Sequence, residues 1–258
     1  MSRLATRDLT VRFGGHVAVN AVSCAFEPGT LTAIVGPNGA GKTTYFNLIS
    51  GQLKASAGQV TLDGRDLSGL SVSQRTRAGL GRAFQLTNLF PRLSVLENVR
   101  LAVQATRVGD HRHGLNLWSI WSDHRELTAR ADEILAAVAL AEKEGELVAN
   151  LPHGDQRKLE VALLMALESK VFMFDEPTAG MNAVEAPVIL NLIRKLKEDK
   201  SKTILLVEHK MDVVRELADR IIVLHNGSLV ADGEPADVIA SPIVQEAYLG
   251  VSAQKEPA

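Results

Sequence analysis

The sequence has little of several features that would mark a particular class of protein. Only one of the 258 residues is a cysteine, Cys24, so a disulfide within the chain and a cysteine-rich zinc site are excluded. Aromatic residues make up 4% of the chain, which argues against a stacking platform for single-stranded nucleic acid. The formal net charge is -2, so we expect no nucleic-acid partner.

Long apolar runs are also missing. No stretch approaches the roughly 18 apolar residues that a membrane-spanning helix needs. Residues 1–13 alternate apolar and polar side chains and do not form the apolar centre of a signal peptide. The sequence therefore predicts a chain that is soluble or peripheral to a membrane.

The composition that remains is that of a globular protein, with 46% hydrophobic and 22% charged residues. A chain of this length can form a core without disulfides or a structural metal. Strand-like segments alternate with segments of helical periodicity, which predicts an α/β fold with a mostly parallel sheet. Strands are expected at residues 4–13, 31–35, 172–174, 203–207 and 221–224, with a helix across residues 188–196.

The middle of the chain has a different pattern. From about residue 94 to residue 167 the periodicity is mostly helical, and strand-like segments are few. We interpret this region as a helical subdomain inserted into the α/β core, which resumes near Val171. Residues 107–123 have no clear period, so we expect an irregular stretch whose tryptophans, Trp118 and Trp121, pack within the subdomain.

A phosphate-binding loop lies at Gly36–Thr44 (GPNGAGKTT), after the expected strand at 31–35 and before a helix that should end near Gly51. It fits the pattern G-x-x-x-x-G-K-[ST], in which glycines let backbone N–H groups approach phosphate oxygens. The helix N-terminus adds a favourable dipole. Lys42 would reach the β- and γ-phosphates of ATP, and the Thr43 hydroxyl would bind Mg²⁺. The residues predicted to bind the nucleotide are Gly36, Asn38, Gly39, Ala40, Gly41, Lys42, Thr43 and Thr44.

An acidic pair, Asp175 and Glu176, follows the apolar strand at 172–174. At the carboxyl end of a strand in the same sheet, the pair would face the crevice that holds the phosphate loop. Asp175 would hold Mg²⁺ directly or through water, and Glu176 would take a proton from the attacking water. The sequence therefore predicts an ATPase with Glu176 as its general base.

These residues resemble the nucleotide-binding subunits of ABC transporters, and the resemblance covers nearly the whole chain. Residues 151–162 (LPHGDQRKLEVA) look like the family signature, usually written LSGGQ, and lie upstream of the acidic pair as the family requires. Gln85 resembles the Q-loop glutamine, His209 the switch histidine, and Phe13 the aromatic residue that stacks on adenine. The order of these features along the chain makes the resemblance specific.

The resemblance implies a P-loop NTPase core with an N-terminal antiparallel β portion, in one ABC ATPase domain over residues 1–258. The α/β core would occupy residues 1–85 and 168–258, and the helical subdomain residues 86–167. Two subunits would enclose ATP, so the second ATPase subunit is a partner. The residues implied in catalysis are Glu176, His209, Lys42 and Gln85, and those implied in binding Mg²⁺ are Thr43, Gln85 and Asp175. The residues implied to reach ATP across the dimer are Leu151, His153, Gly154 and Asp155.

Within the family, residues 82–100, the AGMN segment after the acidic pair and the ending VQEAYLG look most like the branched-chain amino-acid importer branch. This implies membrane permease subunits that dock near Leu86–Val99, an indirect solute-binding partner, and a peripheral position on the cytoplasmic face of the membrane. The apolar residues of that segment are equally well explained as subdomain core. The alternatives are an importer for urea or short amides and a soluble ABC ATPase of iron–sulfur assembly.

Three positions depart from the family pattern. Pro152 replaces the signature serine, whose hydroxyl bonds the γ-phosphate held by the opposite subunit, and proline has neither a hydroxyl nor an N–H to donate. His153 replaces a glycine, and either supplies a new donor or points to solvent. Gly154 and the following helix N-terminus remain as positive groups. Asn182 stands where many members have Asp, and its spacing from Glu185 is that of a capping box.

Overall fold

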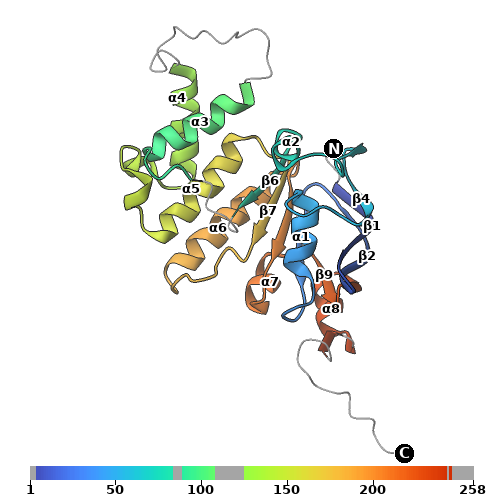
Figure 1. The fold of residues 1–258 in the computed structure, drawn as a ribbon. Helices are drawn as coiled ribbons and strands as arrows, with labels where there is room; N and C mark the ends of the chain where they lie inside the picture. The colour runs from blue at the N-terminus through green and yellow to red at the C-terminus, as the bar shows by residue number, and fades with distance from the viewer. Residues whose placement is uncertain (1–3, 84–88, 108–124, 243, 246–258) are drawn as a thin grey trace, which may run out of the picture.

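The computed structural model describes residues 4–83, 89–107, 125–242 and 244–245. Two sheets organise this part of the chain (Figure 1). The larger has the strand order β10-β9-β3-β8-β7-β6, in which all neighbours are parallel except β10 and β9. Its strands are β3 (Leu31–Val35), β6 (Leu80–Ala83), β7 (Val171–Asp175), β8 (Thr203–Val207), β9 (Arg220–His225) and β10 (Ser228–Gly233).

The smaller sheet is antiparallel and has the order β2-β1-β4-β5. The predicted N-terminal strand is β1, but its alternation breaks at Asp8, where φ is 47° and the pairing with β2 shifts register. A residue in this left-handed conformation turns the following side chains to the other face of the strand. The strands are β1 (Leu4–Phe13), β2 (His16–Phe26), β4 (Ala57–Leu62) and β5 (Arg65–Asp66).

Helices cover both faces of the larger sheet. In Figure 1, α3, α4 and α5 form a group on one side, and α1 lies between the two sheets on the other. The helices are α1 (Lys42–Ser50), α2 (Val72–Arg77), α3 (Val95–Arg107), α4 (Arg125–Ala137), α5 (His153–Ala166), α6 (Glu185–Glu198), α7 (Met211–Leu217) and α8 (Pro235–Ala240). Two short 3-10 helices, η2 (Ala141–Lys143) and η3 (Val148–Asn150), lead into α5.

The strands at the centre of the larger sheet are buried along their whole length, as their continuous apolar sequences predict. Successive side chains of β7 point to opposite faces. Phe172 and Phe174 join one apolar cluster with α3, α4, α5 and α6, whereas Val171 and Met173 join another with α1 and the antiparallel sheet. The predicted α/β architecture, with its antiparallel portion and inserted helices, is confirmed.

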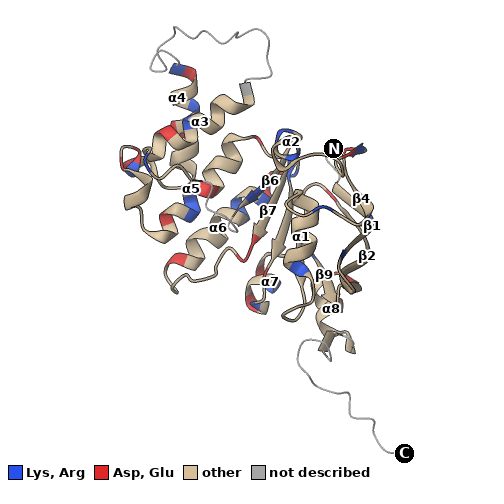
Figure 2. Ribbon diagram, viewed as in Figure 1, with Lys and Arg blue, Asp and Glu red and all other residues tan. Residues whose placement is uncertain are grey.

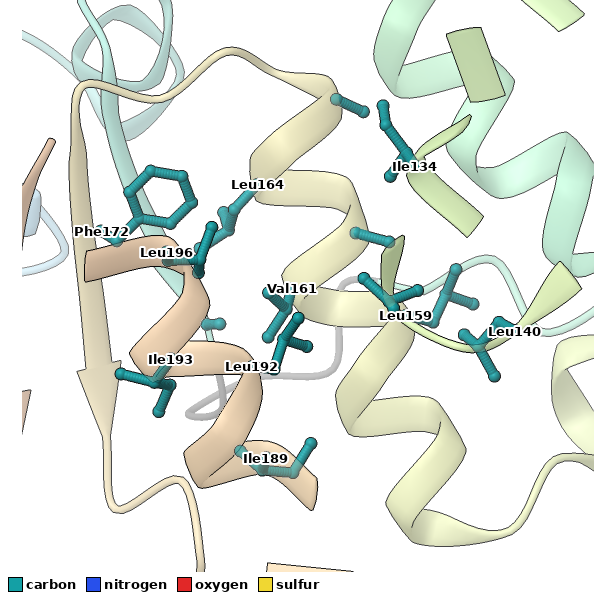
Figure 3. Close-up of a cluster of buried hydrophobic side chains, with 14 of the residues drawn as sticks. Ile134, Leu140, Leu159, Val161, Leu164, Phe172, Ile189, Leu192, Ile193 and Leu196 are labelled. Carbon is teal, nitrogen blue, oxygen red and sulfur yellow. The ribbon is translucent and has the colours of Figure 1, made fainter. Parts of the chain in front are cut away.

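Figure 3 shows how the inserted helices join the sheet. Leu159, Val161 and Leu164 of α5 lie between Ile134 of α4 and the side chains of α6 and β7. These residues belong to one buried cluster, so no layer of solvent separates the inserted helices from the core. The helices are therefore held by the same apolar packing that covers the sheet.

A buried arginine closes the end of α1. Arg75 of α2 is 3% exposed, and its guanidinium donates to four backbone carbonyls. Two of them belong to the last turn of α1, whose carbonyls have no partner within the helix. The acceptors are the oxygens of Leu48 at 2.8 Å, Ile49 at 2.7 Å, Ser68 at 3.1 Å and Leu70 at 3.2 Å.

We predict that Arg75→Met lowers the free energy of unfolding by about 3 kcal/mol, because several buried carbonyls lose a charged donor together. Urea denaturation followed by circular dichroism measures the change. Arg77→Met is the matched control, since Arg77 lies on the same helix and is exposed. Equal losses in the two variants would contradict the capping role of Arg75.

Candidate functional site

The phosphate loop, Gly36–Thr44, connects the end of β3 to the start of α1. Its glycines are required by close backbone approaches. A Cβ on Gly36 would lie 2.1 Å from the Leu224 carbonyl oxygen, and one on Gly41 would lie 2.6 Å from that of Ala18. Both glycines have positive φ, at 152° and 97°. Gly39 also has positive φ, and a Cβ built on it would have no neighbouring atom within 4 Å, so the space beside the loop is open at this residue.

The N-terminus of α1 suits an anion. Gly41 is the N-cap, no side chain caps the helix, and its first turn has no acidic residue. The free N–H groups and the helix dipole therefore present a positive end to the loop. Thr43 is exposed and Thr44 half-buried at this end, and Asn38 is exposed within the loop, whereas Ala40 is buried. This donor set fits the phosphates of a nucleotide.

Lys42 lies folded along the loop. Its Nζ donates to the carbonyl oxygens of Gly36 at 2.6 Å and Pro37 at 3.0 Å, and the residue is 8% exposed. Burial lowers the pKa of the Lys42 ammonium, and the nearby carboxylates of Glu176 and Asp175 act in the opposite direction. The lysine is thus held at the loop by neutral carbonyls that a phosphate can replace.

Asp175, the last residue of β7, forms a buried ion pair. Its Oδ2 accepts from Nη2 of Arg82 at 2.7 Å, and the two side chains are 6% and 7% exposed. Burial raises the pKa of Asp175 above its ordinary value, and the Arg82 guanidinium opposes that rise. The ion pair therefore stabilises the charged form of a carboxylate that burial alone would tend to protonate.

Arg82, on β6, has further partners that fix its position. Its Nη1 donates to side-chain oxygens of Asn47 at 2.6 Å, Ser50 at 2.9 Å and Gln52 at 3.0 Å. The guanidinium also lies over the ring of Phe46, with 5.3 Å from Cζ to the centroid. Arg82 thus joins α1 to the carboxylate at the end of β7.

Glu176 and His209 meet across the ends of β7 and β8. The Glu176 N–H donates to the carbonyl oxygen of Val207 at 2.9 Å, and the residue has a φ of 50°. Its Oε1 lies 4.0 Å from Nδ1 of His209, and the two side chains are 43% and 51% exposed. The structure thus brings together two residues that the sequence predicted to be catalytic.

These groups share one edge of the larger sheet. In the parallel register, Asp175 lies opposite Val207, and Val207 lies opposite Ile34. The residues that follow each strand therefore emerge at the same edge. Figure 2 shows acidic residues in red at the end of β7 and a basic residue in blue at the start of α1, toward this edge.

Phe13 is 52% exposed at the end of β1, so its ring is not part of the core. The glycine pair Gly14-Gly15 follows it in the turn to β2. An exposed aromatic at this position is free to pack against a planar ligand.

The signature residues begin α5, with Pro152 as its N-cap. His153 is exposed, Gly154 is buried, and Leu151 is 4% exposed within the helical cluster. Burial tends to raise the pKa of Asp155, but hydrogen bonds from Lys143 at 2.6 Å and Lys158 at 2.7 Å lower it overall. Asp155 therefore ties the first turn of α5 to the preceding segment.

The spacing around Asn182 forms a capping box, as predicted. Its Oδ1 accepts from the N–H groups of Val184 and Glu185, both at 2.9 Å, and its own N–H donates to the Glu185 carboxylate at 3.4 Å. The regular helix α6 begins at Glu185, so the box closes the turn just before it.

Some predicted positions lie outside the described residues. These include Gln85, Trp118 and Trp121, as well as part of the expected docking segment Leu86–Val99. Within the described part of that segment, Val95 is fully buried in the core, and Leu89 packs partly against it. Phe90 is 54% exposed, so only some of the apolar residues are core.

Sequence reasoning missed three residues that structure this site: Arg82, Thr178 and Glu208. Glu208 is fully buried at the end of β8, and its carboxylate accepts the Thr178 hydroxyl at 2.7 Å. The sequence signals are weak: Glu208 is a charged residue directly before His209, and Arg82 is a charged residue three positions before Gln85. Neither indicates which element holds the partner.

The fold and the site define a phosphate-loop protein of the nucleotide-hydrolysing class. Comparison with known proteins narrows this class. The protein-family model described as ABC transporter matches residues 19–179, and the family model described as Branched-chain amino acid ATP-binding cassette transporter matches residues 228–254. The chain belongs to the ABC transporter family, as an ATP-binding cassette and therefore an ATPase component. The predicted family is confirmed.

Named relatives match nearly the full length. The high-affinity branched-chain amino acid transport ATP-binding protein LivG of Salmonella typhimurium is 39% identical over 248 residues, which cover 96% of this chain and 97% of that protein. The corresponding protein BraF of Pseudomonas aeruginosa is 37% identical over 260 residues, covering 97% and 99%. The resemblance to the branched-chain branch is thus confirmed.

Solved structures agree with the fold. The ADP conformation of the ATP-binding cassette MJ1267 has a TM-score of 0.81 at 30% identity, covering 97% of this chain and 100% of that one. The cassette MJ0796, in a dimeric post-hydrolysis state with ADP and Pi, has a TM-score of 0.74 at 26% identity, covering 90% and 98%. Within the described ranges, no helix is both long and apolar enough to cross a membrane.

We predict that Arg82→Met destabilises the protein in a pH-dependent way. Without its partner, the pKa of Asp175 rises further above its ordinary value of 3.8, so the folded state binds a proton that the unfolded state releases. The free energy of unfolding of the variant then falls as pH rises through the interval between the ordinary and the raised pKa of Asp175. Relative to the parent, the loss is about 3 kcal/mol at neutral pH and becomes smaller toward acidic pH. Urea denaturation from pH 4 to 8 measures it.

The double variant Arg82→Met/Asp175→Asn is the control, since it has no buried carboxylate to titrate at this position. Its loss relative to the parent should be much less dependent on pH. If the single and double variants lost the same free energy at every pH, the ion pair would not account for the effect of Arg82.

Proposed function

We propose that this chain is the ATP-hydrolysing subunit of an importer for branched-chain or closely related amino acids. One observation carries the proposal: the phosphate loop, the acidic pair and His209 follow three adjacent parallel strands and emerge at one sheet edge. The names of the full-length relatives and the C-terminal family match support the class of solute. ATP hydrolysis would supply the free energy for transport.

The roles of the residues follow from their positions. The N–H groups at the start of α1 and the Lys42 ammonium would bind the phosphates of ATP, and Phe13 would stack on adenine. Glu176 would accept the proton of the attacking water, and His209, across from it, would contact the γ-phosphate. The exposure of Glu176 and His209 supports access of substrate to both.

A Mg²⁺ ion bound with ATP would neutralise charge on the phosphates. Thr43, Asp175 and Gln85 are the residues that would hold it. Mg²⁺ is commonly bound through one or two carboxylates together with substrate phosphates. The described residues contain no cluster of three or more His, Cys, Asp or Glu side chains that could hold a metal ion. Asp175 keeps Oδ1 outside its ion pair with Arg82.

The chain would act with partners. Two ATPase subunits would enclose ATP, and each would offer Leu151, His153, Gly154 and Asp155 to the site of the other. Permease subunits would dock near Leu86–Val99, where exposed Phe90 supports a contact, and a solute-binding protein would act through them. The chain would lie in the cytoplasm on the inner face of the membrane.

We predict that transport depends on Lys42. The chain is purified in mild detergent with its permease subunits, reconstituted in proteoliposomes, and assayed for uptake of radiolabelled leucine with external solute-binding protein and enclosed ATP. Lys42→Ala should reduce both ATP binding and uptake to background, because the phosphates lose a buried ammonium. Uptake of urea in place of leucine would contradict the proposed class of solute. Isolation of the chain in a complex that lacks a membrane subunit would contradict its role in an importer.

We predict that Glu176→Gln binds ATP but hydrolyses it at least 100-fold more slowly, because glutamine cannot accept the proton. The ATP-bound dimer should therefore accumulate and be seen by size-exclusion chromatography with light scattering. Glu216→Gln is the control for loss of one carboxylate, since Glu216 is an exposed glutamate of α7, and should hydrolyse ATP far faster than Glu176→Gln. Hydrolysis by Glu176→Gln at the parental rate would exclude Glu176 as the general base.

A further inference from the structure

A fully buried carboxylate lies between the two segments that contain the proposed catalytic side chains. Glu208 is 0% exposed and directly follows β8. Glutamate is rarely buried to this extent, because removing its charge from water costs several kcal/mol unless hydrogen bonds compensate. The groups that donate hydrogen bonds to Glu208 offset this cost, and they therefore show which segments its carboxylate holds in place.

The donors to the Glu208 carboxylate come from both segments. Oε1 accepts the hydroxyl of Thr178 at 2.7 Å, and Thr178 lies two residues after Glu176. Oε2 accepts the backbone N–H of His209 at 2.8 Å and that of Lys210 at 3.2 Å. One oxygen thus holds the segment after β7, and the other holds the segment after β8.

A second contact closes this arrangement. The ammonium of Lys210 lies 3.4 Å from the Thr178 hydroxyl oxygen and donates to it. Thr178 is 1% exposed, so its hydroxyl donates in a site protected from water. Hydrogen bonds to a charged acceptor in such a site are shorter and stronger than those between neutral groups.

The geometry at His209 follows from these bonds. Its Nδ1 lies 3.5 Å from Oε2 of Glu208 and 4.0 Å from Oε1 of Glu176. The side chains of His209 and Glu176 are both about half exposed to solvent. Of these three side chains, Glu208 alone is fully buried, and both of its carboxylate oxygens accept hydrogen bonds.

We propose that Glu208 is a positioning residue for ATP hydrolysis, and that with Thr178 it fixes His209 relative to Glu176. The inference rests on the roles given to Glu176 and His209 under Proposed function. Glutamine has the same shape as glutamate, but one of its two terminal groups is a donor. In Glu208→Gln, the amide N–H groups therefore either face the backbone N–H groups of His209 and Lys210, or replace the oxygen that accepts the Thr178 hydroxyl.

The test measures the rate of ATP hydrolysis, binding of the fluorescent analogue TNP-ATP, and the unfolding temperature of the purified full-length chain. Glu208→Gln should lower kcat about tenfold, as expected for a misplaced catalytic group, with the Kd for TNP-ATP changed less than about twofold. Glu216→Gln is the control, since Glu216 is an exposed glutamate of α7. It should leave kcat and Kd at parental values.

Thr178 provides the second variant. Thr178→Ser keeps the hydroxyl and should keep kcat near the parental value, whereas Thr178→Val removes it and should lower kcat as Glu208→Gln does. If the unfolding temperature shows that Glu208→Gln does not fold, the two Thr178 variants still test the proposal. Equal rates for Thr178→Ser and Thr178→Val, both folded, would overturn the proposal.

A double variant separates positioning from general structural support. If Glu208 acts through His209, Glu208→Gln should have little further effect on kcat in a chain that already has His209→Ala. A tenfold loss in both backgrounds would overturn the positioning role alone. A His209→Ala chain that hydrolyses ATP at the parental rate would instead contradict the role of His209 under Proposed function, and the inference with it.

Discussion

The parallel register of β7, β8 and β3 is the constraint on which the rest of the site depends. Asp175, Val207 and Ile34 lie opposite one another across these strands, and all three strands run in the same direction. The chain therefore leaves each strand at the same edge, where ligands bind in open α/β sheets. Segments far apart in the sequence meet there only because the strands pair in this register. The continuous apolar sequences of the three strands, buried on both faces, stabilise it.

Charges buried behind that edge connect the elements that form it. Arg82 joins β6 to α1 and to the carboxylate that ends β7, and Glu208 joins the segments after β7 and β8. In a low-dielectric interior, such bonds are strong, and the loss of one partner is costly for the other. The same charges thus stabilise the fold and fix the groups that face substrate. Arg75 has a comparable structural role at the far end of α1, where its acceptors are carbonyls only.

The sequence predicted the features that depend on short segments. The bounds of β1, β3 and β8 coincide with the predicted strands, because a buried strand has an apolar pattern that needs no partner to be recognised. The phosphate loop was predictable for the same reason, since its glycines and lysine act within one turn of the chain. Arg82 and Glu208 were not, because their roles depend on which strands pair. The break in β1 at Asp8 was also missed, since a left-handed residue there leaves the apolar alternation on either side intact.

The exposure of the site argues that a single subunit is incomplete. Glu176 and His209 are about half exposed, and Phe13 is more than half exposed, so these side chains face solvent in one subunit. Electrostatic stabilisation of phosphoryl transfer is strongest where water is excluded, so a second surface must cover this edge. The N-terminus of α5 would suit that purpose, because the helix dipole is positive there. Asp155 does not cancel that charge, since Lys143 and Lys158 both pair with it. The substitution of the signature serine by Pro152 therefore removes one hydroxyl donor from the proposed dimer site, where the N-terminus of α5 would still offer its positive dipole to the phosphates.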